Sequence, residues 1–371
     1  MYTFGIIGAG AGVFRHHREA LSSLPGQIVA LADIKPDPAE QRAQEIGCPF
    51  YLDYHQMLAE QQPKIAVILT PPFLHASIAI DCLRAGCHVL VEKPMALHIG
   101  EADAMIAASR QAGRLLAVVF QHRFDTEILT AKNMLEREIL GEVQYVEMRA
   151  LWPRPASYYQ AVPWRATWRG EGGGVLMNQA PHDLDLLCFL FGLPERVIGW
   201  TSRLLHRTLE TEDTAQALLH WSNGMVGSLF VSTGAGGQSH VAIVGTAGTL
   251  TLTGPSAVQR HPSTYAPLSV DMRTFVSSPR PQPLPRPLPP STFEIGRSGT
   301  HLQVYRALCR ALDGGNVEEE ELALGVQGRW SLELAQAILH SARTGGEPVS
   351  LPLPSTIPPV RIPSFLSLSP T

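Results

Sequence analysis

The sequence predicts an α/β fold in which a doubly wound parallel sheet precedes an α+β domain with a large, mainly antiparallel open sheet. Two observations support this. From residue 3 to about 120, short apolar runs alternate with helical patterns, as in parallel βαβ units. After residue 121, short strands with alternating polarity follow one another and are separated by turn residues, which is typical of an antiparallel sheet.

The first half contains the expected parallel strands and the helices between them. Apolar runs that are continuous enough to be buried on both faces lie at residues 3–8, 28–33, 65–70, 88–92 and 115–120. Two intervening helical segments end at Gly86 and Gly113, as expected of helices that stop at a glycine. We therefore expect a first domain over residues 1–121.

The second half is expected to form one domain over residues 122–347. A helix at about 124–139 precedes a strand at 142–150, and the segments TAQALLHW, MVGSLFVST, SHVAIVG and GTLTLT predict further strands. Helices are expected at about 300–313 and 321–343. The proline-rich stretch 277–290 predicts an extended loop with polyproline character, and residues 348–371 a proline-spaced tail that cannot be helical.

Composition narrows the class of protein. With 371 residues, 45% hydrophobic and 17% charged, the chain can bury a large core. A net charge of -4 without a run of Lys and Arg makes nucleic acid an unexpected partner. The five cysteines are scattered without a C-x-x-C pair, which fits a reducing compartment. No signal peptide or membrane-spanning run is apparent, so we expect a cytoplasmic protein without a membrane partner.

A glycine-rich turn, GAGAGV, follows the first strand and opens a helix. Gly8 would make the tight turn, and Gly10 would let the backbone approach a pyrophosphate, although Val13 stands where a third glycine is usual. Asp33 ends the next strand, where a carboxylate accepts hydrogen bonds from ribose hydroxyls and repels a 2′-phosphate. The turn predicts a Rossmann domain that binds NAD, and Lys35 keeps NADP possible.

Further cofactor contacts are expected where the parallel strands end, because the ligand crevice of such a sheet lies at the carboxyl ends of its strands. The predicted cofactor-binding residues are Gly8, Gly10, Ala11, Gly12, Asp33, Thr70, Pro71, His75, Glu92 and Lys93.

The stretch GGGVLMNQAPHDLD (172–185) places Asn178, His182 and Asp185 four and three residues apart. On one continuous helix they would share a face, and that face lacks the Lys, Glu and Arg usual on a solvated surface. The preceding glycines would let the helix start approach a ligand closely. Pro181 interrupts this pattern, because inside a helix it leaves a carbonyl unpaired. The helix either kinks or restarts there, and a restart would remove the meaning of the four-residue spacing.

The stretch VEKPMAL (91–97) together with GGGVLMNQAPHDLD resembles the glucose-fructose oxidoreductase and inositol dehydrogenase family. The resemblance covers nearly the whole chain and includes GEVQYVEMR, PWRATW, IVGTAGTLTL and SARTGGEPVSLPL. It implies that Lys93 lies beside the nicotinamide and that the glycine-rich segment brings further groups to the substrate. It also implies a homodimer or homotetramer through the open sheet of the second domain.

The chemistry of this family explains the residue types. Transfer of a hydride from a carbinol carbon requires loss of the hydroxyl proton, so Lys93 is the expected acid/base, with a pKa lowered by burial and by the oxidised nicotinamide. A cis bond at Pro94 would aim it. His182 would share the proton transfer or position the substrate. Asn178 replaces the usual Asp and cannot hold a proton, so we expect it to bind a sugar hydroxyl. Asp185 either orients His182 or faces solvent.

PWRATW supplies Trp164 and Arg165, since a planar ring and a fork of donors suit a polyhydroxylated ring. An oligomer contact or a core tryptophan is the competing interpretation. Arg123 and Tyr158 are further candidates for substrate binding. No metal site is expected, because His16, His17, His75 and His122 lack metal-ligand spacing with carboxylates.

These inferences predict an NAD-dependent oxidoreductase that interconverts a secondary alcohol and a ketone on a sugar, cyclitol or sugar derivative. Two alternatives stay open at this stage. One is an NAD-dependent glycosidase of related fold that works by transient oxidation, and the other is a cofactor-binding regulator without turnover.

Overall fold

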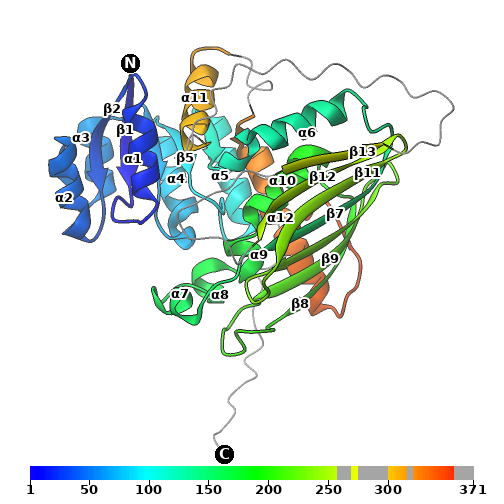
Figure 1. Cartoon of the computed structure of the whole chain (residues 1–371). Coiled ribbons are helices and arrows are strands. Elements are labelled where there is room, and N and C mark those ends of the chain that lie inside the picture. Colours follow the sequence, from blue (N-terminus) through cyan, green and yellow to red (C-terminus); the bar gives the residue numbers. More distant parts are fainter. Residues whose placement is uncertain (257–268, 275–299, 316–320, 355–371) are drawn as a thin grey trace, which may run out of the picture.

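The computed structural model describes residues 1–256, 269–274, 300–315 and 321–354. The predicted proline-rich loop (277–290) and the tail after residue 354 lie outside this range. Two sheets organise the chain, one in the blue and cyan part of Figure 1 and one in the green and yellow part.

The first sheet has seven strands in the order β14-β6-β5-β4-β1-β2-β3. Its strands are β1 (Tyr2–Ile7), β2 (Gly26–Ala32), β3 (Phe50–Tyr51), β4 (Ile65–Ile68), β5 (His88–Val91), β6 (Leu116–Val118) and β14 (Ala323–Leu324). β1 to β6 are parallel, as predicted, and β14 runs antiparallel to β6. The strand order reverses between β1 and β4, so their carboxyl ends border the crevice where an open parallel sheet binds its ligand.

Helices cover both faces of this sheet (Figure 1). They are α1 (Phe14–Ser22), α2 (Pro36–Ile46), α3 (Tyr54–Gln61), α4 (His75–Arg84) and α5 (Ile99–Ala112), with short 3-10 turns η1 (Pro72–Leu74) and η2 (Gln121–Phe124). The strands were predictable because their side chains are buried on both sides: all four residues of β4 are 0% exposed.

The second sheet has eight strands in the order β13-β12-β11-β7-β10-β9-β8-β15. They are β7 (Val143–Leu151), β8 (Arg196–Ser202), β9 (Thr214–His220), β10 (Val226–Ser232), β11 (Gln238–Gly245), β12 (Gly248–Ser256), β13 (Ser269–Thr274) and β15 (Val349–Ser350). Neighbours are antiparallel except β7 and β10, which confirms the mainly antiparallel sheet. The long helix α12 (Gly325–Arg343) packs against β8 and α10 (Pro181–Phe191).

The remaining helices are shorter than the sequence suggested. The helix expected at 124–139 is η2 followed by α6 (Thr126–Glu136). Between β7 and β8 lie α7 (Ala156–Gln160), α8 (Trp168–Glu171) and α9 (Val175–Asn178). No helix of the described residues is long and apolar enough to cross a membrane.

The predicted domain boundaries need correction near the end of the chain. α11 (Thr300–Leu312) packs on α1, and its Tyr305 and Leu308 are fully buried in the core of the first sheet. β14 extends that same sheet, so the first domain contains residues from well beyond 121. Conversely, β15 pairs with β8, which places the start of the supposed tail in the second sheet. These contacts join segments far apart in the sequence, so no local pattern of hydrophobic residues could predict them.

Candidate active site at the edge of the parallel sheet

The glycine turn closes tightly against the neighbouring strand end. Gly8 has a φ of +86°, and a Cβ there would lie 2.7 Å from the backbone nitrogen of Thr70, so only glycine fits. The Gly10 N–H donates to Asp33 Oδ2 at 2.8 Å, while the Lys35 N–H donates to Asp33 Oδ1 at 2.9 Å. Asp33 is half-buried at the end of β2. The turn, Thr70 and Asp33 therefore form one continuous edge, as predicted.

A cation near this turn was missed in the sequence. Arg42, on α2, donates to the carbonyls of Ala9 and Ala11, the latter at 3.0 Å, and its guanidinium lies 4.8 Å from the centre of the Phe14 ring. α1 begins at Phe14, after Val13 at the position of the missing third glycine. Arg42 thus stabilises the glycine turn, although it lies on α2 and far from the turn in the sequence.

His75 lies inside the protein between two backbone carbonyls. Its side chain is 1% exposed, with Nδ1 2.8 Å from the Pro94 carbonyl oxygen and Nε2 2.8 Å from the Thr70 carbonyl oxygen. Burial lowers the pKa of the imidazole. His75 therefore ties the end of β4 to the loop after β5, and its contact with a cofactor stays a prediction.

Glu92 anchors the end of β5. Its Oε2 accepts the Lys93 N–H at 3.1 Å, and its Oε1 lies 3.0 Å from His17 Nε2 and 4.0 Å from His301 Nε2. Burial by itself would raise the pKa of this carboxyl, but the His17 hydrogen bond and the nearby cations lower it to about 2. The Tyr305 hydroxyl contacts His17 Nδ1 at 2.8 Å.

This cluster brings together α1, β5 and α11, which the sequence could not join. The ligand-type atoms of His17, Glu92 and His301 all lie within 4.8 Å of one another, a geometry that also occurs in metal sites. Because both ring nitrogens of His17 already meet protein groups, we interpret the cluster as a hydrogen-bonded network.

Lys93 is half-buried where the two domains meet. The Lys93–Pro94 peptide bond is cis, as hypothesised, and Nζ donates to the backbone carbonyl of Asn178 at 2.6 Å. Burial lowers the pKa of the ammonium, and the negative charges of Glu92 and Glu171 partly offset that effect. A lysine in this setting releases its proton more readily than an exposed lysine does.

The helix of the GGG stretch restarts, which settles one open alternative. α9 ends at Asn178 and α10 begins at Pro181, in the first turn where proline is favoured. The glycines also approach protein instead of a ligand, because a Cβ on Gly174 would lie 1.8 Å from the Glu212 carbonyl oxygen. The spacing of Asn178 and His182 therefore carries no geometric meaning, and tertiary packing alone places them.

His182 lies half-buried beside two aromatic rings. Its ring centre is 4.8 Å from that of His122 and 5.8 Å from that of Phe120, and its Nδ1 is buried without a hydrogen-bond partner among the described residues. Burial, then the positive charges of His122 and Lys93, keep the pKa of His182 well below its ordinary value. It is a neutral imidazole close to Lys93.

Asn178 is the centre of a polar network of which the sequence predicted only some members. Its Oδ1 accepts from the Tyr158 hydroxyl at 3.1 Å and from Gln179 Nε2 at 2.8 Å, and its Nδ2 donates to Glu171. Glu171 is 3% exposed, and burial raises its pKa to about 7. Nothing in the sequence distinguished this glutamate from an ordinary surface residue.

Three predicted substrate-binding residues stack together next to Asn178. The Arg165 guanidinium lies 4.0 Å from the ring centre of Tyr158 and 5.6 Å from that of Trp164. It also donates to the Tyr158 carbonyl at 2.6 Å. The structure thus groups Trp164, Arg165, Tyr158 and Asn178, and their contact with a substrate stays a prediction.

Arg123 and Asp185 have a different role from the predicted ones. Arg123 is 2% exposed and binds Asp185 through two parallel bonds, from Nε at 2.8 Å and from Nη2 at 2.6 Å. Asp185 is 1% exposed, so it neither faces solvent nor orients His182. The expectation that Arg123 binds substrate is wrong, because its fork is committed to a buried carboxylate.

The fold and the glycine turn define a NAD-binding Rossmann protein with a second, mostly antiparallel domain. Residues 2–120 match the oxidoreductase family with an NAD-binding Rossmann fold, and residues 128–251 match the GFO/IDH/MocA C-terminal domain. The chain belongs to the GFO/IDH/MocA oxidoreductase family, as its sequence motifs predicted.

Individual relatives agree with this assignment. The chain is 32% identical over 193 residues to the uncharacterized oxidoreductase YdgJ of Escherichia coli, covering 51% of this chain and 54% of the relative. It is 25% identical over 231 residues to myo-inositol 2-dehydrogenase of Thermotoga maritima, covering 60% and 66%. The match thus spans less than two thirds of either relative.

Solved structures match over almost the whole chain. The WlbA dehydrogenase from Bordetella pertussis, in complex with NADH and UDP-GlcNAcA, is 30% identical with a TM-score of 0.79, covering 95% of this chain and 99% of that one.

Proposed function

We propose that this protein is an NAD-dependent oxidoreductase that moves a hydride between a secondary alcohol of a sugar, cyclitol or sugar derivative and the nicotinamide. The observation that carries the proposal is half-buried Lys93, with its Nζ 2.6 Å from the Asn178 carbonyl and its pKa lowered by desolvation. It stands at the carboxyl end of β5, on the same edge as the glycine turn.

The residues of the turn fit NAD. A Cβ at Gly8 would lie 2.7 Å from the Thr70 backbone nitrogen, and one at Gly10 would lie 2.9 Å from Asp33 Oδ2, so both positions favour the glycines typical of a pyrophosphate-binding turn. Asp33 keeps its carboxylate half-exposed at the end of β2, where it would accept ribose hydroxyls. When bound, NAD supplies the hydride acceptor.

The chain's own groups supply the rest of the chemistry. In oxidation, Lys93 as a neutral amine takes the proton of the reacting hydroxyl, and in reduction the ammonium returns it. His182, held neutral, offers a hydrogen bond to the same oxygen or its neighbour. Trp164, Arg165 and Tyr158 form the wall that would hold the remaining hydroxyls.

The substrate class follows from this wall and from what relatives bind. Stacked aromatic rings and a guanidinium suit the apolar face and the oxygens of a sugar ring. The WlbA dehydrogenase structure contains UDP-GlcNAcA, and a matched relative is named as a myo-inositol 2-dehydrogenase. We therefore propose sugars, cyclitols and their nucleotide derivatives as the class to test.

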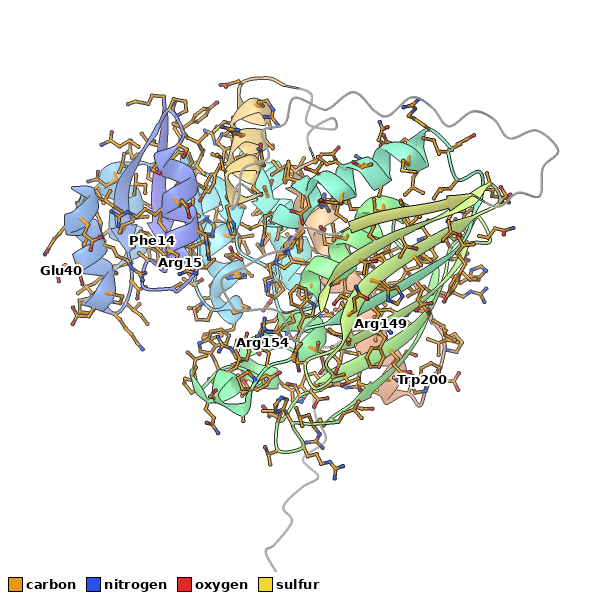
Figure 2. All side chains as sticks on the ribbon, in the orientation of Figure 1. Phe14, Arg15, Glu40, Arg149, Arg154 and Trp200 are labelled. Atoms are coloured by element: carbon orange, nitrogen blue, oxygen red, sulfur yellow. The ribbon has the colours of Figure 1, made fainter. Side chains whose placement is uncertain are left out.

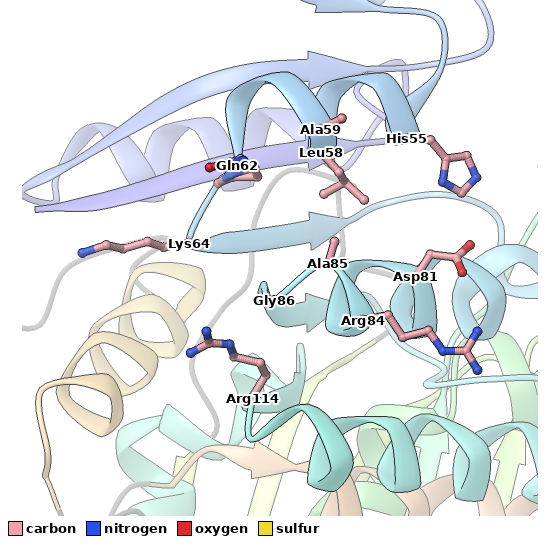
Figure 3. Close-up of a pocket in the computed structure, with 11 residues that line it drawn as sticks. His55, Leu58, Ala59, Gln62, Lys64, Asp81, Arg84, Ala85, Gly86 and Arg114 are labelled. Carbon is pink, nitrogen blue, oxygen red and sulfur yellow. The ribbon is translucent and has the colours of Figure 1, made fainter.

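The test is NADH formation with NAD or NADP against aldoses, inositols, anhydrosugars and UDP-sugars, run beside Lys93→Met. Turnover with NAD that is lost in Lys93→Met supports the proposal. The matched control is Lys64→Met, because Lys64 lines a separate cavity of about 630 Å³ with Arg84 and Arg114 (Figure 3). Equal turnover in wild type and Lys93→Met would refute the role of Lys93.

We also propose that a second copy of the chain covers the outer face of the eight-stranded sheet. Trp200 is 46% exposed and Leu218 is 53% exposed there, and they line a shallow hollow with Phe230 and Arg149. Figure 2 labels Arg149 and Trp200 on this sheet. α12 packs against β8, so it covers the inner face of the sheet. Light scattering should show a wild-type dimer or tetramer, and Leu218→Lys should convert it to smaller species. A wild-type protein that is already monomeric would contradict the proposal.

A further inference from the structure

Glu171 is a buried carboxylate to which the proposed chemistry assigns no task. It ends α8, is 3% exposed, and accepts the Ala166 N–H at 2.5 Å and the side-chain amide of Asn178. Burying a carboxylate is costly unless it is bonded or paired, so its position next to the site calls for a reason.

Asn178 links this carboxylate to Lys93. Its Oδ1 accepts from Tyr158 and Gln179, which leaves Nδ2 to face Glu171. The main-chain carbonyl of the same residue accepts from Lys93 Nζ at 2.6 Å. One residue therefore separates the ammonium from the Glu171 carboxylate.

We propose that Glu171 is a positioning residue that keeps Lys93 able to hold a proton inside its buried site. The inference rests on the proposed acid/base role of Lys93. Burial favours the neutral amine, which serves oxidation, over the ammonium that reduction needs. When Glu171 is ionised, its negative charge raises the pKa of Lys93, and its bond to Asn178 fixes the residue whose carbonyl accepts from Nζ.

The electrostatic influence is mutual. The charge of Glu171 raises the pKa of Lys93, and that of Lys93 lowers the pKa of Glu171, against the larger effect of burial in both cases. Removing either charge therefore changes the proton affinity of the other group.

Other charged groups around the pair come from several elements. They are Glu92 after β5, Arg154 after β7, Arg165 before α8, and His182 and Asp183 on α10. Glu92 is already bonded by His17, and Asp183 accepts from the Trp152 indole at 2.9 Å. Arg154, which lies between the two sheets in Figure 2, lowers the proton affinity of Lys93. Glu171 is linked to Lys93 through one shared residue, Asn178.

The experiment titrates Lys93 directly, without substrate, by trace acetylation over a pH series with mass-spectrometric readout of the Lys93 peptide. Three proteins are compared with wild type: Glu171→Gln, the swap Glu171→Gln/Asn178→Asp, and Glu212→Gln. Glu212 is the matched control, because burial raises its pKa to about 7 as well, but its Oε1 bonds the Gly174 and Leu176 N–H groups.

The proposal expects the Lys93 titration to move to lower pH in Glu171→Gln, to return toward wild type in the swap, and to stay unchanged in Glu212→Gln. The swap restores one negative charge within the same hydrogen-bonded pair, which a packing defect would not mimic. An unmoved titration in Glu171→Gln, or a shift that the swap leaves in place, would overturn the proposal.

The pH profile of kcat then gives a second readout, and NAD binding checks that each variant is folded. Because labelling requires no turnover, a protein inactive toward every sugar would count against the proposed function while leaving the titration result valid. Conversely, an active enzyme whose Lys93 titrates identically in Glu171→Gln overturns only the role of Glu171.

Discussion

Arg123 and Lys93, one buried and one half-buried, meet their carboxylates in different ways. Arg123 binds Asp185 directly through two bonds of 2.8 Å and 2.6 Å, whereas Lys93 reaches Glu171 only through Asn178. A guanidinium keeps its proton and matches a carboxylate fork, while a buried amine readily loses its proton. The fully buried guanidinium is therefore a structural tie, whereas the half-buried amine can exchange its proton.

The largest effect is expected from a substitution that keeps the positive charge of Lys93 but removes its ability to release a proton. Lys93→Arg keeps a cation but cannot release a proton, so kcat should fall by about 10²- to 10⁴-fold. Steady-state kinetics on the best substrate, with NAD binding measured separately, checks this. Activity retained in Lys93→Arg would show that Lys93, like Arg123, does not need to exchange a proton.

The next effect concerns the structural tie. Asp185→Asn leaves the buried Arg123 guanidinium without its charged partner and should lower the free energy of unfolding by about 3–5 kcal/mol. Urea denaturation measures it. Glu45→Gln is the control, because its pair with Arg18 is 42% and 44% exposed and should change stability by less than about 1 kcal/mol.

A third carboxyl sharpens the comparison, because backbone N–H groups bond it. Burial raises the pKa of Glu212 to about 7, above its unfolded value, so the folded state favours the protonated form and stability falls as pH rises toward 7. Glu212→Gln should remove this fall, a difference of about 3 kcal/mol between acid and neutral pH. Urea denaturation at a series of pH values measures the free energy of unfolding of both proteins. The same pH dependence in wild type and Glu212→Gln would disprove the prediction.

The smallest effect concerns a carboxylate at the surface edge. Asp33→Asn keeps an acceptor for the Gly10 N–H but weakens the expected bonds to the ribose, so KM for NAD should rise about tenfold and the preference over NADP should narrow. Kinetics with both cofactors measures this. A KM unchanged for both would place the ribose elsewhere.

Much of the fold was predictable because its signals are local. Strands β1, β2, β4, β5 and β6 are short apolar runs buried on both faces, and the glycine turn with Asp33 spans one βαβ unit. β3 was missed because two residues carry no period. The GGG helix was ambiguous because Pro181 permits both a kink and a restart, and only the backbone path decides between them.

The sequence by itself determined the class of fold, the NAD-binding turn and the motif that carries Lys93, since each depends on residues close together along the chain. The tertiary structure decided which groups each of these side chains contacts. It buried Arg123 against Asp185, placed His75 between two carbonyls, joined His17, Glu92 and His301, and set Glu171 beside Asn178. The physical reason is that burial and charge depend on what surrounds a group from all sides, which no local pattern records.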